Sequence, residues 1–195
     1  MKELETIEMF ISEDEDSGIS AISFVERPAI QENFIALSEH KVELTTMDED
    51  KRIVIGLALV PNKKILRSNR GYEYNIEFSE ETVRKASMKY LKTLKLHNAT
   101  EDHKEGFIEG VHLCETWIVE DSLKDKTALY GLNAPVGSWA VSLKVNDDAL
   151  WKKIKNGEYL GFSIEGTFKG ERQDFAAMDK IEALLDEYKK QKRNE

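Results

Sequence analysis

Cysteine is almost absent from this sequence, which holds a single one, Cys114, in 195 residues. One cysteine cannot form a disulfide within the chain, and zinc sites built from four cysteines are excluded. The four histidines also lack an H-x-x-x-H or comparable spacing, and neither common form of glycine-rich phosphate loop occurs. The sequence therefore predicts a protein of a reducing compartment, with no metal site.

Long apolar runs and basic patches are missing as well. No apolar stretch approaches the roughly 18 residues needed to cross a bilayer, and the first residues lack the basic and apolar regions of a signal peptide. Acidic residues outnumber basic ones by 37 to 28, which gives a formal net charge of -9. A face that grips phosphates needs clustered lysine and arginine. We therefore expect a cytoplasmic protein that binds neither membrane nor nucleic acid.

The apolar content of 41% is enough for one domain with a hydrophobic core. Most of the elements that the apolar pattern predicts are strands. Acidic residues 43–50 suggest a division into an N-terminal strand with an acidic linker (residues 1–50), a main body (51–170) and a charged amphipathic helix (171–195). The order of elements predicts an α+β fold with a mostly antiparallel barrel or sandwich. Periodicity and capping residues predict strands over residues 19–25, 53–60, 72–78, 108–119, 138–145 and 159–166, and helices over residues 79–91 and 147–155.

Ser163 is a candidate nucleophile within the segment GFSIEG at residues 161–166. Alternation along a strand turns Phe162 and Ile164 to one face, and Ser163 and Glu165 to the other. The flanking glycines allow another backbone, such as a bound peptide, to come close. The segment nevertheless lacks the specificity of a nucleophile-elbow motif. The pattern alone favours a surface serine on an edge strand.

A nucleophilic serine needs a base, and two histidines bracket the polar loop at residues 97–107. Loops held at strand ends commonly carry catalytic bases, so His97 and His103 are both candidates. Asp102 and Glu101 could raise the pKa of His103 and orient its ring. Residue chemistry alone leaves His97 and His103 equal. The other two histidines lie in a polar stretch and inside a strand: His40 and His112.

Glu115 is an unusual carboxylate because alternation places it in an apolar row with Val111, Leu113, Trp117 and Val119. A buried carboxylate without a partner costs several kcal/mol. A histidine would satisfy it, and so would a structural ion pair with lysine or arginine. Composition favours the ion pair.

Several ordered segments resemble a known family. They read EDHKEG (residues 101–106), GVHLCETWIVED (110–121), PVGSWAVSLKV (135–145) and a stretch from Trp151 to GFSIEG (151–166). In this order they resemble the prohead proteases of tailed phages, of the type carried by defective prophages of Gram-positive bacteria. The resemblance spans roughly residues 52–168.

The resemblance implies a serine protease with a fold similar to herpesvirus assemblin, a closed β-barrel surrounded by helices. It implies that Ser163 is the nucleophile and that His103, rather than His97, is the base. The third catalytic residue does not transfer, and we predict Glu115, with Glu165 as the alternative. The order of the chain also departs from the family pattern. In many of these proteases an apolar strand that ends in Pro-Ala follows the serine, whereas here the similar segment, residues 22–29, lies near the N-terminus.

The function implied by the resemblance is that of an endopeptidase that needs no cofactor. Its partners would be the phage scaffold and major capsid protein, cleaved inside the assembling procapsid in the host cytoplasm. Self-cleavage and self-association fit the same role. Two alternatives remain: an inactive capsid-assembly protein of the same fold that docks on scaffold through residues 173–195, and an unrelated β-barrel binding module. The position of Ser163 relative to His103 distinguishes them.

Overall fold

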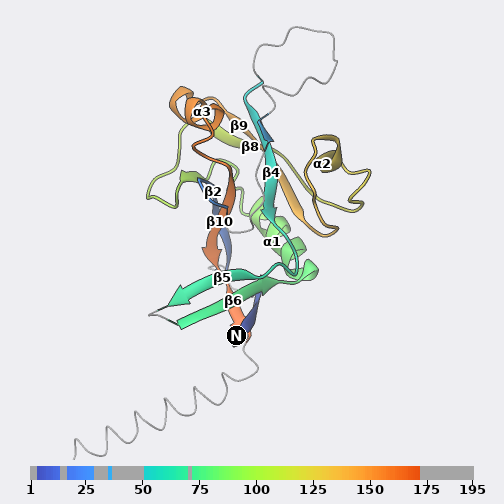
Figure 1. Ribbon diagram of the computed structural model, residues 1–195. Helices are drawn as coiled ribbons and strands as arrows, with labels where there is room; N and C mark the ends of the chain where they lie inside the picture. The colour runs from blue at the N-terminus through green and yellow to red at the C-terminus, as the bar shows by residue number, and fades with distance from the viewer. Residues whose placement is uncertain (1–3, 14–16, 29–34, 37–50, 70–71, 172–195) are drawn as a thin grey trace, which may run out of the picture.

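A computed structural model describes residues 4–13, 17–28, 35–36, 51–69 and 72–171. In this part of the chain the strands form three separate sheets, and the helices lie around them (Figure 1). Six of the eight strand pairings are antiparallel and two are parallel. The sheets are therefore a mixture of antiparallel and mixed types.

The three-stranded sheet, which we call the central sheet, has the strand order β10-β2-β7. β2 runs antiparallel to β10 and parallel to β7. An early strand, β2, is thus held between two later ones, and Figure 1 shows β2 in blue beside β10 in orange. The strands are β2 (Gly18–Val25), β7 (Ala99–Glu101) and β10 (Gly161–Thr167).

Two further sheets of four strands complete the strand framework. One has the order β11-β1-β6-β5, in which β1 and β6 are parallel, and the other has the order β3-β4-β9-β8, in which every pairing is antiparallel. The first comprises β1 (Thr6–Phe10), β5 (Ile65–Asn69), β6 (Tyr72–Phe78) and β11 (Lys169–Glu171). The second comprises β3 (Ile35–Ala36), β4 (Ile53–Leu59), β8 (Val111–Ile118) and β9 (Trp139–Val145).

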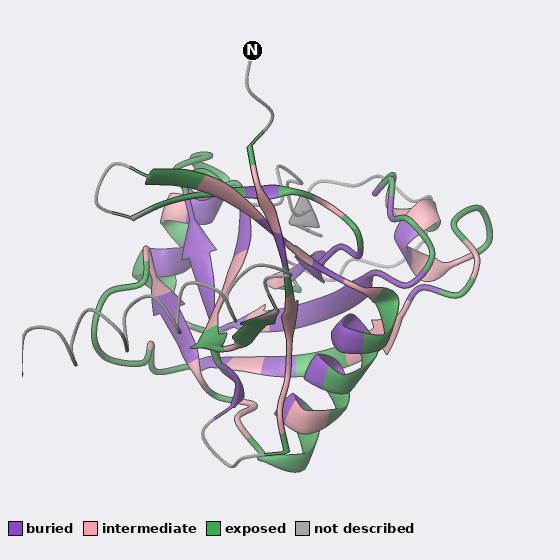
Figure 2. Cartoon of the chain, turned by 90° about the horizontal axis from the view of Figure 1, so that it is seen from below, coloured by how far each residue is buried: buried purple, intermediate pink, exposed green. Residues whose placement is uncertain are grey.

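The core lies between the sheets and the inner face of α1 (Glu80–Lys92). Figure 2 shows buried residues along the strands and on one side of this helix, with exposed residues on its other side. Ser79 caps the helix by accepting a hydrogen bond from the backbone of Thr82. The ring of Tyr90 packs edge-on against Trp139, with 5.5 Å between centroids. The other helices are α2 (Lys126–Leu129) and α3 (Asp148–Lys155).

The expected closed β-barrel is wrong. β10 lies near β4, but no ladder of hydrogen bonds joins these two strands among the described residues, and none of the three sheets closes. β7 is only three residues long and a turn ends it, so it offers no long edge for another strand. Alternation along a strand shows which side chains share a face, but it does not show which strands pair.

Each expected strand and both helices of the main body are present, with ends shifted by a few residues. The periodicity missed the short strands and one helix: β1, β3, β5, β7, β11 and α2. β1 and β2 of the N-terminal segment pair with strands of the main body. The boundaries predicted at residues 50 and 170 stay predictions. The acidic stretch at residues 43–50 and the predicted C-terminal helix from Gln173 lie outside the described residues.

Candidate functional site

One row of the central sheet carries three hydroxyl side chains. Strand register places Ser163 of β10 opposite Ser23 of β2, and Ser23 beside Thr100 of β7. Ser23 is fully buried, and Ser163 is partly exposed. Thr100 lies one residue before the end of β7, and His103 follows that end by two residues. Strand pairing thus brings Ser163 of β10 toward the loop that carries His103.

His103 is held in a tight turn with an uncommon backbone conformation. Asp102 and His103 have φ values of 47° and 58°, and the amide of Lys104 donates to the carbonyl of Glu101 at 2.9 Å. Two successive positive φ values within such a bond are typical of a type I′ turn, and Asp and His tolerate this region better than most residues. The amide of His103 also donates to the Ser23 hydroxyl at 3.0 Å. The buried Ser23 thereby fixes the backbone of His103.

The start of this turn is anchored by Glu101. Its carboxylate accepts from Lys153 of α3 and from the hydroxyl of Tyr159, both at 2.6 Å. Burial alone would raise the pKa of Glu101, but the two hydrogen bonds outweigh it and the pKa is lowered. Burial, and then the hydrogen bond to Glu101, raise the pKa of Tyr159 well above its ordinary value. Glu101 thus ties the end of β7 to α3 and to the segment before β10.

Glu101→Gln should therefore lower the free energy of unfolding at neutral pH by about 1 kcal/mol, because Lys153 is 38% exposed and the pair is partly screened. The folded-state pKa of Glu101 lies below its unfolded value of about 4.3. Its stabilisation is hence complete above that value and lost as pH falls through the folded pKa. Denaturant unfolding of wild type and variant should show a difference at pH 7 that closes below about pH 4. A difference that persists in acid would contradict the ionic origin of this contact.

Glu165 lies beside the His103 ring. One of its carboxylate oxygens is 3.3 Å from Nδ1 of His103, and the same oxygen accepts a short hydrogen bond from the hydroxyl of Thr100. The Glu165 side chain is 27% exposed and that of His103 is 45% exposed. The carboxylate is thus held by Thr100 on the sheet and meets the ring at the edge of solvent. Glu165, which the sequence offered as the alternative, is the carboxylate that contacts His103.

Ser163 and His103 line the same open pocket, of about 570 Å³. Arg67 and Asp102 line it too, together with the end of β2. The hydroxyl of Ser163 makes no hydrogen bond to any residue that the structure describes, His103 included. Catalytic hydrogen bonds are often long in the absence of substrate. Ser163 and His103 thus share one pocket, and the Glu165 carboxylate contacts the His103 ring.

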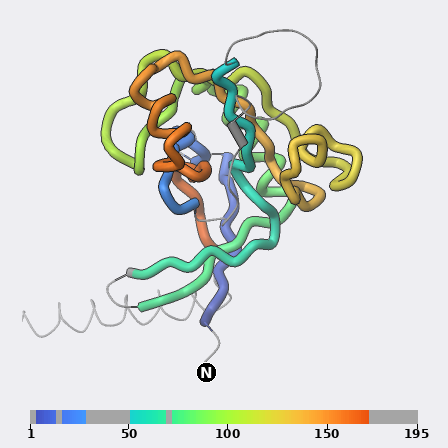
Figure 3. Tube along the Cα trace, turned by 45° about the horizontal axis from the view of Figure 1, so that its top comes forward, coloured from blue at the N-terminus to red at the C-terminus, as the bar shows by residue number. Residues whose placement is uncertain are grey.

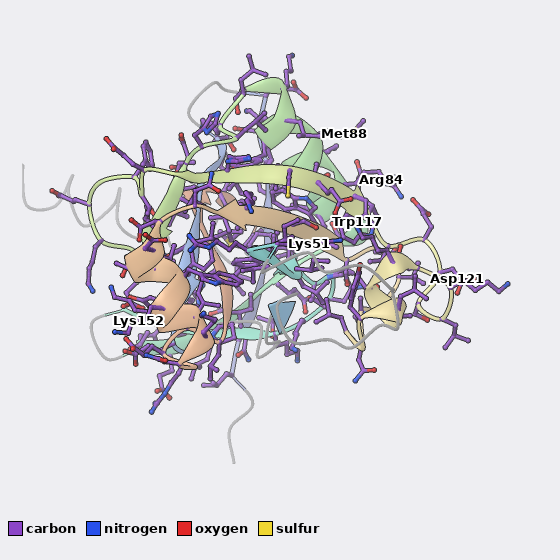
Figure 4. All side chains as sticks on the ribbon, turned by 90° about the horizontal axis from the view of Figure 1, so that it is seen from above. Lys51, Arg84, Met88, Trp117, Asp121 and Lys152 are labelled. Carbon is purple, nitrogen blue, oxygen red and sulfur yellow. The ribbon has the colours of Figure 1, made fainter. Side chains whose placement is uncertain are left out.

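The structure does not bring Glu115 to this pocket. Its carboxylate forms a short ion pair with Lys126 and accepts from the Ser142 hydroxyl at 2.8 Å, and the pKa is lowered by these two bonds, that from Lys126 first. α3, whose Lys153 contacts Glu101 at the start of the His103 turn, lies at one end of the molecule, as the labelled Lys152 shows (Figure 4). β8, which carries Glu115, extends toward the other end, as the labelled Trp117 shows. The structural ion pair that composition favoured is present.

A break in alternation explains the position of Glu115. The β8–β9 register places Leu113 opposite Leu143 but Glu115 opposite Ser142, so Cys114 is the extra residue of a bulge. Cys114 and Glu115 are consequently both exposed. The apolar row that predicted a buried carboxylate stops before Glu115.

The remaining histidines lie elsewhere, as far as the described residues show. The rings of His97 and His112 lie 5.9 Å apart, and neither residue lines the pocket of Ser163. His40 is outside the described residues. Within the described part of the chain, no cluster of His, Cys, Asp and Glu has the arrangement of a metal site. No helix there is long and apolar enough to cross a membrane.

Sequence reasoning missed three residues of this site. Ser23 and Thr100 fix His103 and Glu165, and Arg67 lines the pocket. Burial lowers the pKa of Arg67, and no carboxylate pairs with it in the part of the chain that the structure describes. None of the three belongs to a recognisable motif, because each reaches the site through pairing between distant segments.

Comparison of the sequence with models of known protein families shows the family to which the chain belongs. Residues 41–172, well over half of the chain, match the model described as "Putative phage serine protease XkdF". The chain belongs to this phage serine protease family. The match supports a protease role in phage maturation, and the family segment includes Ser163, His103 and Glu165. Comparisons with curated proteins and with solved structures gave no match.

Proposed function

We propose that this protein is a serine endopeptidase in which Ser163 is the nucleophile, His103 the general base and Glu165 the carboxylate that orients the histidine. The observation that carries the proposal is the position of the His103 ring. Its Nδ1 faces Glu165 at 3.3 Å, and the residue shares a pocket with Ser163. The match to phage serine proteases supports the same chemistry.

The contact with Glu165 favours one tautomer of His103. A proton on Nδ1 can be donated to the carboxylate, which leaves the lone pair of Nε2 available to the serine hydroxyl. The hydrogen bond from Thr100 holds the carboxylate on the sheet. Glu165 would also stabilise the imidazolium that forms when His103 accepts a proton. An orienting carboxylate of this kind need not change its own protonation state.

The reaction follows from these roles. Oγ of Ser163 attacks the peptide carbonyl carbon while His103 takes the hydroxyl proton, and the carbonyl oxygen becomes an oxyanion. The intermediate collapses, the C–N bond breaks, and His103 gives its proton to the leaving amine. Water then attacks the acyl-enzyme and gives a proton to His103, which returns it to Ser163 as the ester bond breaks. The products are a carboxylic acid, an amine and the original enzyme.

We further propose scaffold and major capsid protein as substrates, with cleavage inside the assembling procapsid in the host cytoplasm. Membership of a phage serine protease family supports a substrate in phage assembly. Incubation of the purified protein with its own capsid and scaffold proteins tests this, with fragments identified by mass spectrometry. Intact substrates, under conditions in which a fluorophosphonate labels Ser163, would exclude them as substrates and leave the chemistry standing.

Glu165→Gln and Glu115→Gln form a matched pair that tests the site. Each removes a negative charge and keeps the shape of the side chain. Glu165→Gln should lower kcat by up to about ten-thousandfold, as loss of the orienting carboxylate does in other serine proteases. Glu115→Gln should leave kcat close to wild type, because its carboxylate contacts Lys126 and Ser142. Steady-state rates with one peptide substrate measure both.

The opposite ranking would restore Glu115 as the third catalytic residue. Equal and near-normal rates for both variants would leave a dyad of Ser163 and His103 without an essential carboxylate. Thermal unfolding of each variant separates a catalytic loss from a loss of folded protein.

A further inference from the structure

A second, smaller cavity adjoins Ser163. It has a volume of about 160 Å³ and lies between β10 and the strands β4, β5 and β6. Ser163 and Arg67 line both this cavity and the open pocket of His103. The two spaces therefore meet at the proposed nucleophile, one on the side of the base and the other on the side of the core.

Most of the residues that line this cavity have apolar side chains. Ala58, Ile65 and Phe78 are 1%, 4% and 2% exposed, and Ile164 and Phe168 are partly buried members of the lining. The rings of Phe78 and Phe168, both in the lining, meet edge-on with 5.0 Å between their centroids. The charged group in the lining is Arg67, shared with the open pocket. Such a space suits an uncharged, apolar group.

The cavity lies along the edge of β10. Three consecutive residues, Phe162, Ser163 and Ile164, line it, although alternate residues of a strand point to opposite faces. A space that touches all three must lie beside the strand. β10 is the outer strand of its sheet among the described residues, and β4 lies near its unpaired edge, so the cavity is bounded by that edge and the neighbouring strands.

We propose that this cavity receives the side chain of the substrate residue whose carbonyl carbon Ser163 attacks, and that it selects a leucine, methionine or phenylalanine there. The inference rests on the proposed function. A cavity of about 150 Å³ lined by aliphatic and aromatic residues can hold benzene, so about 160 Å³ accommodates one of these side chains. Arg67 adds a rejection of lysine and arginine, because its positive charge lies in the lining.

Peptidyl diphenyl phosphonates that differ only in this side chain test the proposal without a known cleavage site. Oγ of Ser163 attacks phosphorus, a P–O bond forms, and the bond to one phenoxide breaks. His103 carries the serine proton to that phenoxide, which leaves as phenol. The second-order rate of labelling with the leucine, methionine or phenylalanine compound should exceed that of the glycine compound by about tenfold or more. The lysine compound should be slower than the methionine compound, which has a similar length and no charge.

Two substitutions in the cavity should change this preference in opposite directions. Ala58→Leu fills the space and should slow the phenylalanine compound more than the glycine compound. Ile164→Ala enlarges it and should favour phenylalanine over leucine relative to wild type. Rates are compared as ratios within each variant, so a partial loss of folded protein cancels. The wild-type series decides the proposal even if one variant does not fold.

A small fluorophosphonate without a peptide distinguishes a failure of the proposed specificity from a failure of the proposed serine chemistry. If it labels Ser163 but the phosphonates all react at equal rates, the cavity has no role in specificity and the proposed function stands. A preference for a glutamate compound would likewise overturn the apolar assignment and point to Arg67 as the selecting group. If the fluorophosphonate fails to label Ser163 in folded protein, the proposed function and this inference fall together.

Discussion

Ser163→Ala should abolish proteolysis and leave the fold unchanged. Loss of the nucleophile lowers the rate by about a millionfold in a comparable serine protease. The hydroxyl makes no hydrogen bond to any described residue, so its removal leaves no group without a partner. Alanine also adds no atom that the strand must accommodate. Cleavage of a cognate capsid substrate, followed by gel and mass spectrometry beside wild type, measures the loss.

A matched serine variant on the neighbouring strand controls this result. Ser23→Ala removes the acceptor for the backbone amide of His103, so it should lower activity and stability together. Ser163→Ala should lower activity alone, with an unchanged thermal midpoint. A Ser163→Ala protein that retains activity within tenfold of wild type would exclude Ser163 as the nucleophile.

His103→Gln should be nearly as damaging as loss of the serine, because nucleophile and base act as a unit and their losses do not add. Glutamine keeps the backbone amide that donates to Ser23, so the turn retains this bond. Its side-chain amide is too weak a base to accept the serine proton. Initial rates with one peptide substrate, at equal concentrations of folded protein, measure the effect.

His97→Gln is the control for this experiment. His97 packs near the ring of His112 and does not line the pocket of Ser163, so its replacement should change the rate little. Inactive His97→Gln beside active His103→Gln would show that the wrong histidine of the loop was assigned. A double variant, Ser163→Ala with His103→Gln, should be no slower than Ser163→Ala alone, which distinguishes a shared step from two separate effects.

Local patterns in the sequence predicted the parts of the site that lie within one strand. Alternation over residues 161–166 placed Ser163 and Glu165 on one face, and Glu165 does meet His103 in the structure. This prediction needed only the two-residue period with which side chains alternate along an extended strand. The caps at Ser79 and Asp147 were predictable for the same reason.

Patterns within a single segment could not predict how distant segments pair. The loop at residues 97–107 contains β7, whose parallel pairing with β2 places Thr100 beside Ser23. Those two residues are far apart in sequence, and a strand of three residues has no periodicity to read. The bulge at Cys114 had a similar effect, because one extra residue turned Glu115 away from the row that alternation gave it. The prediction of a closed barrel was wrong for the same reason, because closure depends on which strand edges pair.

The position of β2 between β7 and β10 also determines when an active enzyme can exist during translation. β2 is made early, whereas β10, which carries Ser163, is the last of the three strands to be synthesised, as the order of colours along the tube shows (Figure 3). A nascent chain that ends before residue 163 has no nucleophile, and Glu165 follows it by two residues. The proposed active site can therefore form only when synthesis of the strand framework is nearly complete. Nascent chains that have not yet acquired β10 would therefore not digest one another or their neighbours.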